Sequence, residues 1–171
     1  PTAEEQVIQD ANIRALAGGV TVDKIFDMLK RVRKTCSVPI VFMTYANPVF
    51  AYDPDKFLSR CKEVRVDALF IPDLPFEEKE EFLPYCSKYD IFLISMVAPS
   101  SKDRIHMIAE GAQGFVYCVP SMEELSKDKE LVCDVKEMVR LVKETQDIPC
   151  VVGLGNSSFE KAAEAAAFSD G

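Results

Sequence analysis

The stretch Asp67-Ala-Leu-Phe-Ile-Pro-Asp-Leu-Pro-Phe-Glu-Glu78 decides how this chain can fold. Its mostly apolar run, Ala68 to Pro72, is followed directly by Asp73 and then by a charged segment typical of a helix. A strand that is apolar on both faces is what a parallel sheet covered by helices requires. Folds of that kind place their chemistry at the C-terminal ends of the strands. The stretch therefore predicts a buried strand that delivers Asp73 to a functional site.

The same plan, a short apolar strand followed by a helix, repeats along the chain. Two helices are expected first, over about 7–16 and from Thr21 or Val22 to about Lys34. The predicted strands are 38–43, 67–72, 91–95, 115–119 and 149–153. The helices that follow them are predicted from 53 or 54 to 64, over 76–88, from the 98–101 loop to 109, over 133–145, and up to 168. Strands spaced roughly 25–35 residues apart indicate repeated βα units with right-handed crossovers.

Two α/β architectures accommodate such units: an open doubly wound sheet, or part of a (β/α)8 TIM barrel. No predicted strand is followed at once by a G-x-G-x-x-G or G-x-x-x-x-G-K-[ST] loop, which an open nucleotide-binding sheet would carry. The barrel is therefore favoured. The whole stretch 1–171 is predicted to be a single domain, a partial barrel.

Composition excludes several classes of function. The chain has 171 residues, of which 48% are hydrophobic and 28% charged, which is typical of one soluble globular domain. Its net charge of −8, with no cluster of lysines and arginines interleaved with aromatic residues, predicts no nucleic-acid partner. No apolar run is long enough to span a membrane, and the N-terminal residues lack the pattern of a signal peptide. No membrane partner and a cytoplasmic location are therefore expected.

The residues that most often bind metals offer no pattern of a metal site. The single histidine, His106, falls in a predicted helix and is expected at its surface, with no nucleophile paired to it. No C-x-x-C pair is present, so the thiols are predicted to be reduced and mostly buried. The six cysteines are Cys36, Cys61, Cys86, Cys118, Cys133 and Cys150. Neither a metal nor an organic cofactor is expected.

Four segments in register carry a resemblance to a known family. They are Gln9-Asp-Ala-Asn-Ile-Arg-Ala-Leu16, Met43-Thr-Tyr-Ala-Asn-Pro-Val-Phe50, Ile71-Pro-Asp-Leu-Pro75 and Gly114-Phe-Val-Tyr117. In their order and spacing, the chain resembles the tryptophan synthase alpha chain family over essentially all of its length. The resemblance implies a (β/α)8 barrel that cleaves indole-3-glycerol phosphate into indole and glyceraldehyde 3-phosphate by a retro-aldol reaction. It also implies that a tryptophan synthase beta chain is the partner that receives the indole.

The resemblance places the predicted strands as strands 3 to 7 of eight. A complete barrel of this kind needs about 250 residues, and an open one leaves two long unpaired edges. Two explanations stay open: the chain is a fragment, or it closes by pairing with another copy.

The family's chemistry also implies roles for particular residues. Glu4 falls on the position of a catalytic carboxylate that holds the indole N–H, although a solvated acidic stretch would look the same. A second carboxylate would lie upstream. The other implied roles are substrate binding by Tyr45, Phe70, Tyr117, Gly153, Leu154 and Gly155, with the two glycines near the phosphate, and a beta-chain interface at Asn47, Pro48 and Asp73. Ordinary packing stays open for the aromatic residues, and capping of the following helix for Asp73.

One segment departs from the family pattern. After Tyr117 the family has a flexible loop rich in Ser, Gly and Thr, whereas Pro120 to Asp128 contains no glycine. Glu123 and Glu124 in this segment would repel a phosphate if they faced it. Three functions therefore stay open: a working lyase, an alpha-like protein that binds a beta chain without turnover, and another phosphate-binding barrel enzyme.

Overall fold

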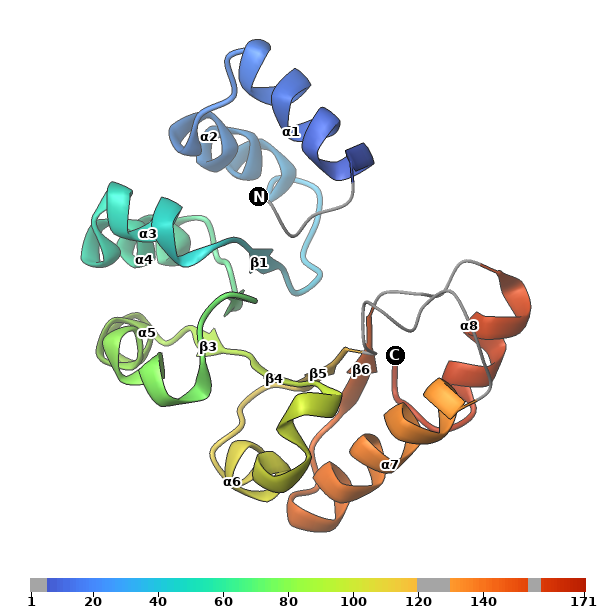
Figure 1. The fold of residues 1–171 in the computed structure, drawn as a ribbon. Coiled ribbons are helices and arrows are strands. Elements are labelled where there is room, and N and C mark those ends of the chain that lie inside the picture. Colours follow the sequence, from blue (N-terminus) through green and yellow to red (C-terminus); the bar gives the residue numbers. More distant parts are fainter. Residues whose placement is uncertain (1–5, 120–129, 154–157) are drawn as a thin grey trace.

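A computed structural model describes residues 6–119, 130–153 and 158–171. In these residues, helices form the outside of an open arc and parallel strands line its inside (Figure 1). The strands are β1 (Val41–Met43), β2 (Ala68–Phe70), β3 (Phe92–Leu93), β4 (Ser95–Val97), β5 (Val116–Cys118) and β6 (Cys150–Val152). The α-helices are α1 (Gln6–Ala17), α2 (Val22–Val32), α3 (Ala46–Tyr52), α4 (Pro54–Glu63), α5 (Leu83–Tyr89), α6 (Ile105–Glu110), α7 (Glu130–Thr145) and α8 (Phe159–Ala166). Two 3₁₀ helices are η1 (Phe76–Glu81) and η2 (Pro99–Arg104). The predicted βα repeat is confirmed.

The third predicted strand, 91–95, is divided in the structure. Its first part, β3, pairs with β2, and its second part, β4, pairs with β5. The change of partner occurs at Ile94, whose N–H still donates to the carbonyl oxygen of Leu69 at 2.9 Å. The strand orders are therefore β1-β2-β3 and β4-β5-β6. Sequence could not show this division because the apolar run continues through it.

Prolines account for two further differences in the helices. The segment predicted as one helix over 76–88 is η1 followed by α5, with Pro84 in the first turn of α5. Proline lacks an N–H, so it cannot continue a helix from the preceding turn. Helix α3 was not predicted, because Asn47-Pro48 is typical of a loop. Pro48 lies in the first turn of α3, where a missing N–H costs nothing.

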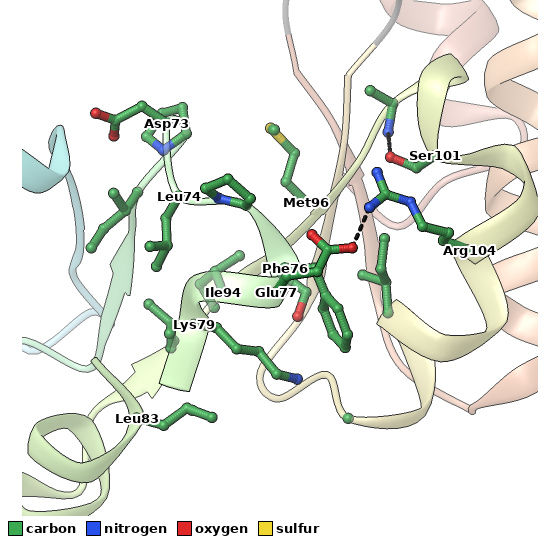
Figure 2. A pocket seen from close by; sticks show the side chains of 18 of the residues that line it. Asp73, Leu74, Phe76, Glu77, Lys79, Leu83, Ile94, Met96, Ser101 and Arg104 are labelled. Atoms are coloured by element: carbon green, nitrogen blue, oxygen red, sulfur yellow. Dashed lines mark hydrogen bonds and ion pairs between the residues drawn. The ribbon is translucent and has the colours of Figure 1, made fainter. Parts of the chain in front are cut away.

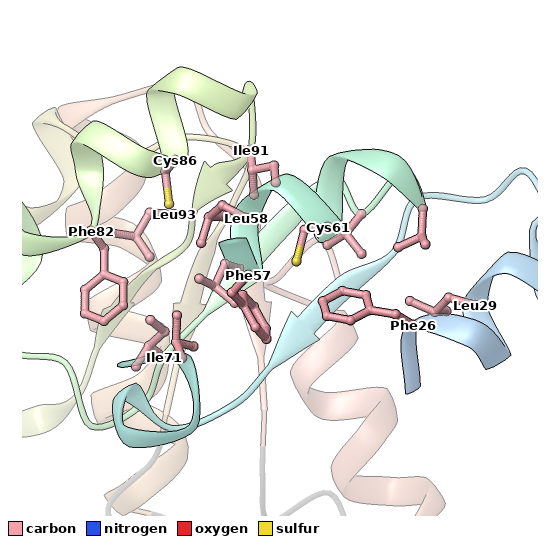
Figure 3. Close-up of a cluster of buried hydrophobic side chains, with 14 residues drawn as sticks. Phe26, Leu29, Phe57, Leu58, Cys61, Ile71, Phe82, Cys86, Ile91 and Leu93 are labelled. Atoms are coloured by element: carbon pink, nitrogen blue, oxygen red, sulfur yellow. The ribbon is translucent and has the colours of Figure 1, made fainter. Parts of the chain in front are cut away.

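Two large hydrophobic clusters fill the space between strands and outer helices. The first, shown in Figure 3, joins β1, β2 and β3 to α2, α4 and α5 and includes Phe26, Leu58 and Phe82. The second joins β4, β5 and β6 to α6 and α7. Cys61 and Cys86 lie in the first cluster, and burial raises their pKa values to about 12 and about 11 respectively. All five described cysteines are free, and the burial of all but Cys36 confirms that these thiols are mostly buried.

A repeated two-bond clamp holds the starts of neighbouring strands together. The N–H of Asp67 donates to the carbonyl oxygen of Ile40 at 2.9 Å, and the Asp67 carboxylate accepts from the Ile40 N–H at 2.8 Å. Asp170 makes the same two bonds to Cys150, at 2.9 and 2.8 Å. The carbonyl of Gly171 then accepts from the Val152 N–H at 2.8 Å. The described C-terminal residues therefore continue the pairing along β6.

Each clamp is completed by a basic side chain from the helix before the clamped strand. Arg33, at the end of α2, lies 3.1 Å from the Asp67 carboxylate, and its side chain is only 7% exposed. Lys143, in the last turn of α7, lies 2.8 Å from the Asp170 carboxylate. Asp67 thus links α2, β1 and β2, whereas Asp170 links α7 and β6 to the C-terminal residues.

Replacing Asp67 with alanine is expected to destabilise the fold. The change leaves the buried Arg33 guanidinium without its carboxylate and the Ile40 N–H without its acceptor. Loss of such a charged acceptor costs about 2 kcal/mol. Urea denaturation of Asp67→Ala would measure the loss, and Asp103→Ala, which alters an exposed carboxylate, should change stability by less than about 0.5 kcal/mol. Equal effects of the two changes would contradict a structural role for the clamp.

The Asp170 clamp is expected to make the stability of the fold depend on pH. The Lys143 ammonium and the Cys150 N–H hold the pKa of the Asp170 carboxyl below its ordinary value. Because the folded pKa is lower than the unfolded one, the stabilisation is present above the unfolded pKa and is lost as pH falls through the folded pKa. Asp170→Asn should therefore lower the melting temperature near neutral pH, and the difference from wild type should shrink below about pH 4. A difference that is the same at every pH would contradict this assignment.

Candidate functional site

Inward-facing side chains of three strands form a small aromatic and aliphatic centre. Ala68 and Phe70 of β2 and Ile94 form a buried cluster on the inner side of the strands, and Tyr117 of β5 packs against it. The rings of Phe70 and Tyr117 lie 4.6 Å apart between centroids. Burial raises the pKa of the Tyr117 hydroxyl, so it stays protonated at neutral pH. The predicted pair is thus brought together in a surrounding that suits a planar apolar group.

Met96 belongs to this centre and was missed by sequence reasoning. It packs against the same inner cluster from β4. Met96 lies two residues after Ile94, and residues two apart in a strand share one face, so this spacing could have indicated an inward position. The sequence reading ended that strand at Ser95, which left Met96 in a loop.

Gly153 directly follows β6 and lies beneath the Tyr117 ring. A Cβ atom at this position would collide with the Tyr117 hydroxyl and ring. Its N–H donates to the carbonyl oxygen of Cys118 at 3.1 Å. The structure therefore gives Gly153 the role of a spacer for the tyrosine, and its amide is already engaged within the sheet.

The residues predicted for an interface gather around the start of α3. Asn47 and Pro48 are exposed in its first turn. The Asp73 carboxylate accepts from the Ala46 N–H at 3.0 Å, so it caps α3. The interpretation of Asp73 as a cap of its own following helix was wrong, because the loop after β2 turns back to the preceding βα unit. Tyr45, the residue before α3, is half-buried and lies outside the inner cluster.

Several predicted site residues lie outside the described residues. They are Glu4, Leu154, Gly155 and the segment from Pro120 to Asp128.

Within the described residues, no group of histidine, cysteine and carboxylate side chains could hold a metal ion. His106 is exposed, as predicted, and its Nδ1 lies 2.6 Å from the Thr145 hydroxyl. No helix in the described part of the chain is long and apolar enough to cross a membrane.

A cavity of about 260 Å³ opens between η1 and η2, beside the inner centre (Figure 2). The carboxylate of Glu77 and the guanidinium of Arg104 form an ion pair across it. The Lys79 ammonium lies 3.9 Å from the centroid of the Phe76 ring. These charged residues were not singled out in the sequence, because they lie far apart in a chain rich in exposed charges.

The comparisons with known proteins agree with one another. The family model of the tryptophan synthase alpha chain matches residues 1–171. The tryptophan synthase alpha chain of Caldanaerobacter subterraneus subsp. tengcongensis is 42% identical over 171 residues, covering 100% of this chain and 65% of the relative. That of Lacticaseibacillus casei is 40% identical, covering 100% and 64%. The chain thus spans just under two thirds of the length of these relatives.

Solved structures give the same result. Tryptophan synthase subunit alpha from Campylobacter jejuni superposes with a TM-score of 0.90 at 28% identity, covering 100% of this chain and 68% of that one. A chain of the aminoacrylate-bound tryptophan synthase of M. tuberculosis gives 0.85 at 31% identity, covering 100% and 65%. These likenesses assign the arc of parallel strands and outer helices to a (β/α)8 barrel, as predicted. Since the family model matches from the first residue to the last, this chain belongs to the tryptophan synthase alpha chain family.

Proposed function

We propose that the protein carrying this chain is a lyase that cleaves indole-3-glycerol phosphate into indole and glyceraldehyde 3-phosphate in tryptophan biosynthesis. Family membership over the whole chain supports the reaction. The contact of Phe70 with Tyr117, whose ring planes are tilted by 35°, is the observation that carries it, since the pair supplies an apolar, aromatic surface for an indole ring. The proposed enzyme acts in the cytoplasm and needs no cofactor.

The reaction needs groups that move two protons and hold one developing charge. A proton is delivered to C3 of the indole, a base removes the proton of the glycerol hydroxyl, and the carbon–carbon bond between them breaks. The positive charge that develops on the indole ring is held by a carboxylate at its N–H. We assign this last role to Glu4, and the proton transfers to a carboxylate that lies upstream of Glu4 in the family.

The phosphate is assigned to the segment after β6. Because the Gly153 amide is bonded to Cys118, we place the anion contacts at Leu154 and Gly155 and keep Gly153 as the spacer that seats Tyr117. Glycine in such a segment lets backbone N–H groups approach an anion closely. Ser158 caps α8 by accepting from the Lys161 N–H at 3.3 Å, so the helix begins directly after this segment.

We further propose that a tryptophan synthase beta chain docks on the face formed by Asn47, Pro48 and Asp73. These residues lie together at the start of α3, beyond the C-terminal ends of β1 and β2. Since substrate would bind at the same ends of the strands, a partner here is well placed to receive indole.

Glu4→Gln is expected to lower indole release by at least about 100-fold, because the neutral amide cannot hold the developing charge. The measurement is indole formation from indole-3-glycerol phosphate by the protein carrying this chain, with and without a beta chain. Glu5→Gln is the matched control and should leave turnover near wild type. A wild-type protein that binds a beta chain but releases no indole would contradict the proposed lyase.

The spacer role of Gly153 predicts a double-mutant cycle. Gly153→Ala should cost about 1–3 kcal/mol of stability, because the added methyl overpacks the Tyr117 ring. In a Tyr117→Ala background the same change should cost less than about 0.5 kcal/mol. Urea denaturation of the four proteins measures both values. Equal costs in the two backgrounds would show that Gly153 does not act through Tyr117.

A further inference from the structure

The cavity between η1 and η2 lies at the place where the two groups of strands separate. Past Ile94, β4 pairs with β5 and leaves β2, so the chain segments that follow β2 and β4 diverge. The cavity fills this gap, with η1 on one wall and η2 and α6 on the other (Figure 2). Its volume of about 260 Å³ corresponds to about nine waters of about 30 Å³ each. A ligand of about ten non-hydrogen atoms would fit.

The floor of the cavity is apolar because it runs along the boundary of the two outer clusters. Leu74, Leu83 and Leu93 reach it from the first cluster, and Ile108 and Phe76 from the second. Phe76 belongs to η1 yet packs against the second cluster. The Phe76 ring thus reaches from η1 across the boundary between the two clusters, and the cavity lies beside it.

Two basic and two acidic side chains line the cavity, and both carboxylates already have bonding partners. Arg104 comes from η2 and Glu77 from η1, and their side chains are 46% and 54% exposed, so the pair contributes little stability and its guanidinium keeps N–H donors on its other edges. Lys79 is half-buried, and its ammonium lies 3.2 Å from where a Cβ of Gly111 would be. Asp73 also lines the cavity, but its carboxylate is bonded to the Ala46 N–H of α3.

We propose that this cavity is a second ligand site, and that it binds a small monocarboxylate with an apolar body. The carboxylate would accept from the free edge of Arg104 and from Lys79, while Glu77 holds the guanidinium in place. The apolar body would lie on Ile108, Leu93 and the Phe76 ring. Both carboxylates of the cavity are already bonded, Glu77 to Arg104 and Asp73 to the Ala46 N–H. The remaining donors of Arg104 and Lys79 therefore favour an anion over an amine, and the apolar floor favours a hydrocarbon body over a sugar or a free phosphate. This site does not depend on the proposed lyase reaction.

The test uses 3-phenylpropanoate as the probe. Titration of the protein, followed by amide shifts in two-dimensional NMR, should move Phe76, Ile108 and Gly111 and leave Phe70 and Tyr117 in place. Arg104→Gln and Lys79→Gln should each weaken the dissociation constant by about tenfold, the value of one charge-assisted hydrogen bond. Arg140→Gln is the matched control, because Arg140 is an exposed arginine paired with Glu137 and Glu144 on α7, away from the cavity. It should bind as wild type does.

Two related compounds test the class of ligand. The alcohol 3-phenylpropan-1-ol has the same body without the charge and should bind at least about tenfold more weakly. L-Phenylalanine adds an ammonium and should also bind more weakly than the probe. Tighter binding of phenylalanine, equal binding of the alcohol, or shifts centred on Phe70 and Tyr117 would each overturn the proposal, as would unchanged affinity in both Arg104→Gln and Lys79→Gln.

Discussion

The buried guanidinium of Arg33 is the constraint on which the first half of the arc depends. It donates to the carbonyl oxygens of Val38 and Val64, at 2.6 and 3.2 Å, and to the Asp67 carboxylate. A cation that is 7% exposed persists only with such partners, since an unpaired buried charge is costly. One side chain therefore sets the end of α2 against the starts of β1 and β2, and the Lys143–Asp170 pair repeats the arrangement at β6.

With the strand starts held in this way, the opposite ends are free to carry chemistry. Strands β2 and β5 bring Phe70 and Tyr117 together, and the loops that follow the strands supply the Asp73 cap on α3 and the cavity around Arg104. Division of roles between the two ends of a barrel is general: one end stabilises and the other binds. In this chain the division is visible in the aspartates, because Asp67 and Asp170 clamp strand starts while Asp73 caps α3 beyond the C-terminal ends of β1 and β2.

The separation at Ile94 links the packing to the proposed binding. Two independent outer clusters mean that the β2 and β4 segments are not sealed against each other beyond that residue. The inner centre and the cavity lie beside each other at this boundary and share Ile94 and Met96. A ligand in the cavity would thus contact Ile94 and Met96, which belong to the same inner cluster as Phe70 and Tyr117.

The amino-acid sequence by itself determined the repeated βα plan, the family, the buried cysteines and the inward positions of Phe70 and Tyr117. These follow from local apolar runs and from the alternation of apolar residues, because strands and helices each impose their own spacing on the residues that they bury. Only the tertiary structure decided that Asp73 caps α3, that Gly153 seats the Tyr117 ring, and that Glu77 meets Arg104 across a cavity. Each of these depends on how one βα unit is oriented against the next. Contacts between residues far apart in the chain produce no regular spacing in the sequence, so the sequence does not reveal them.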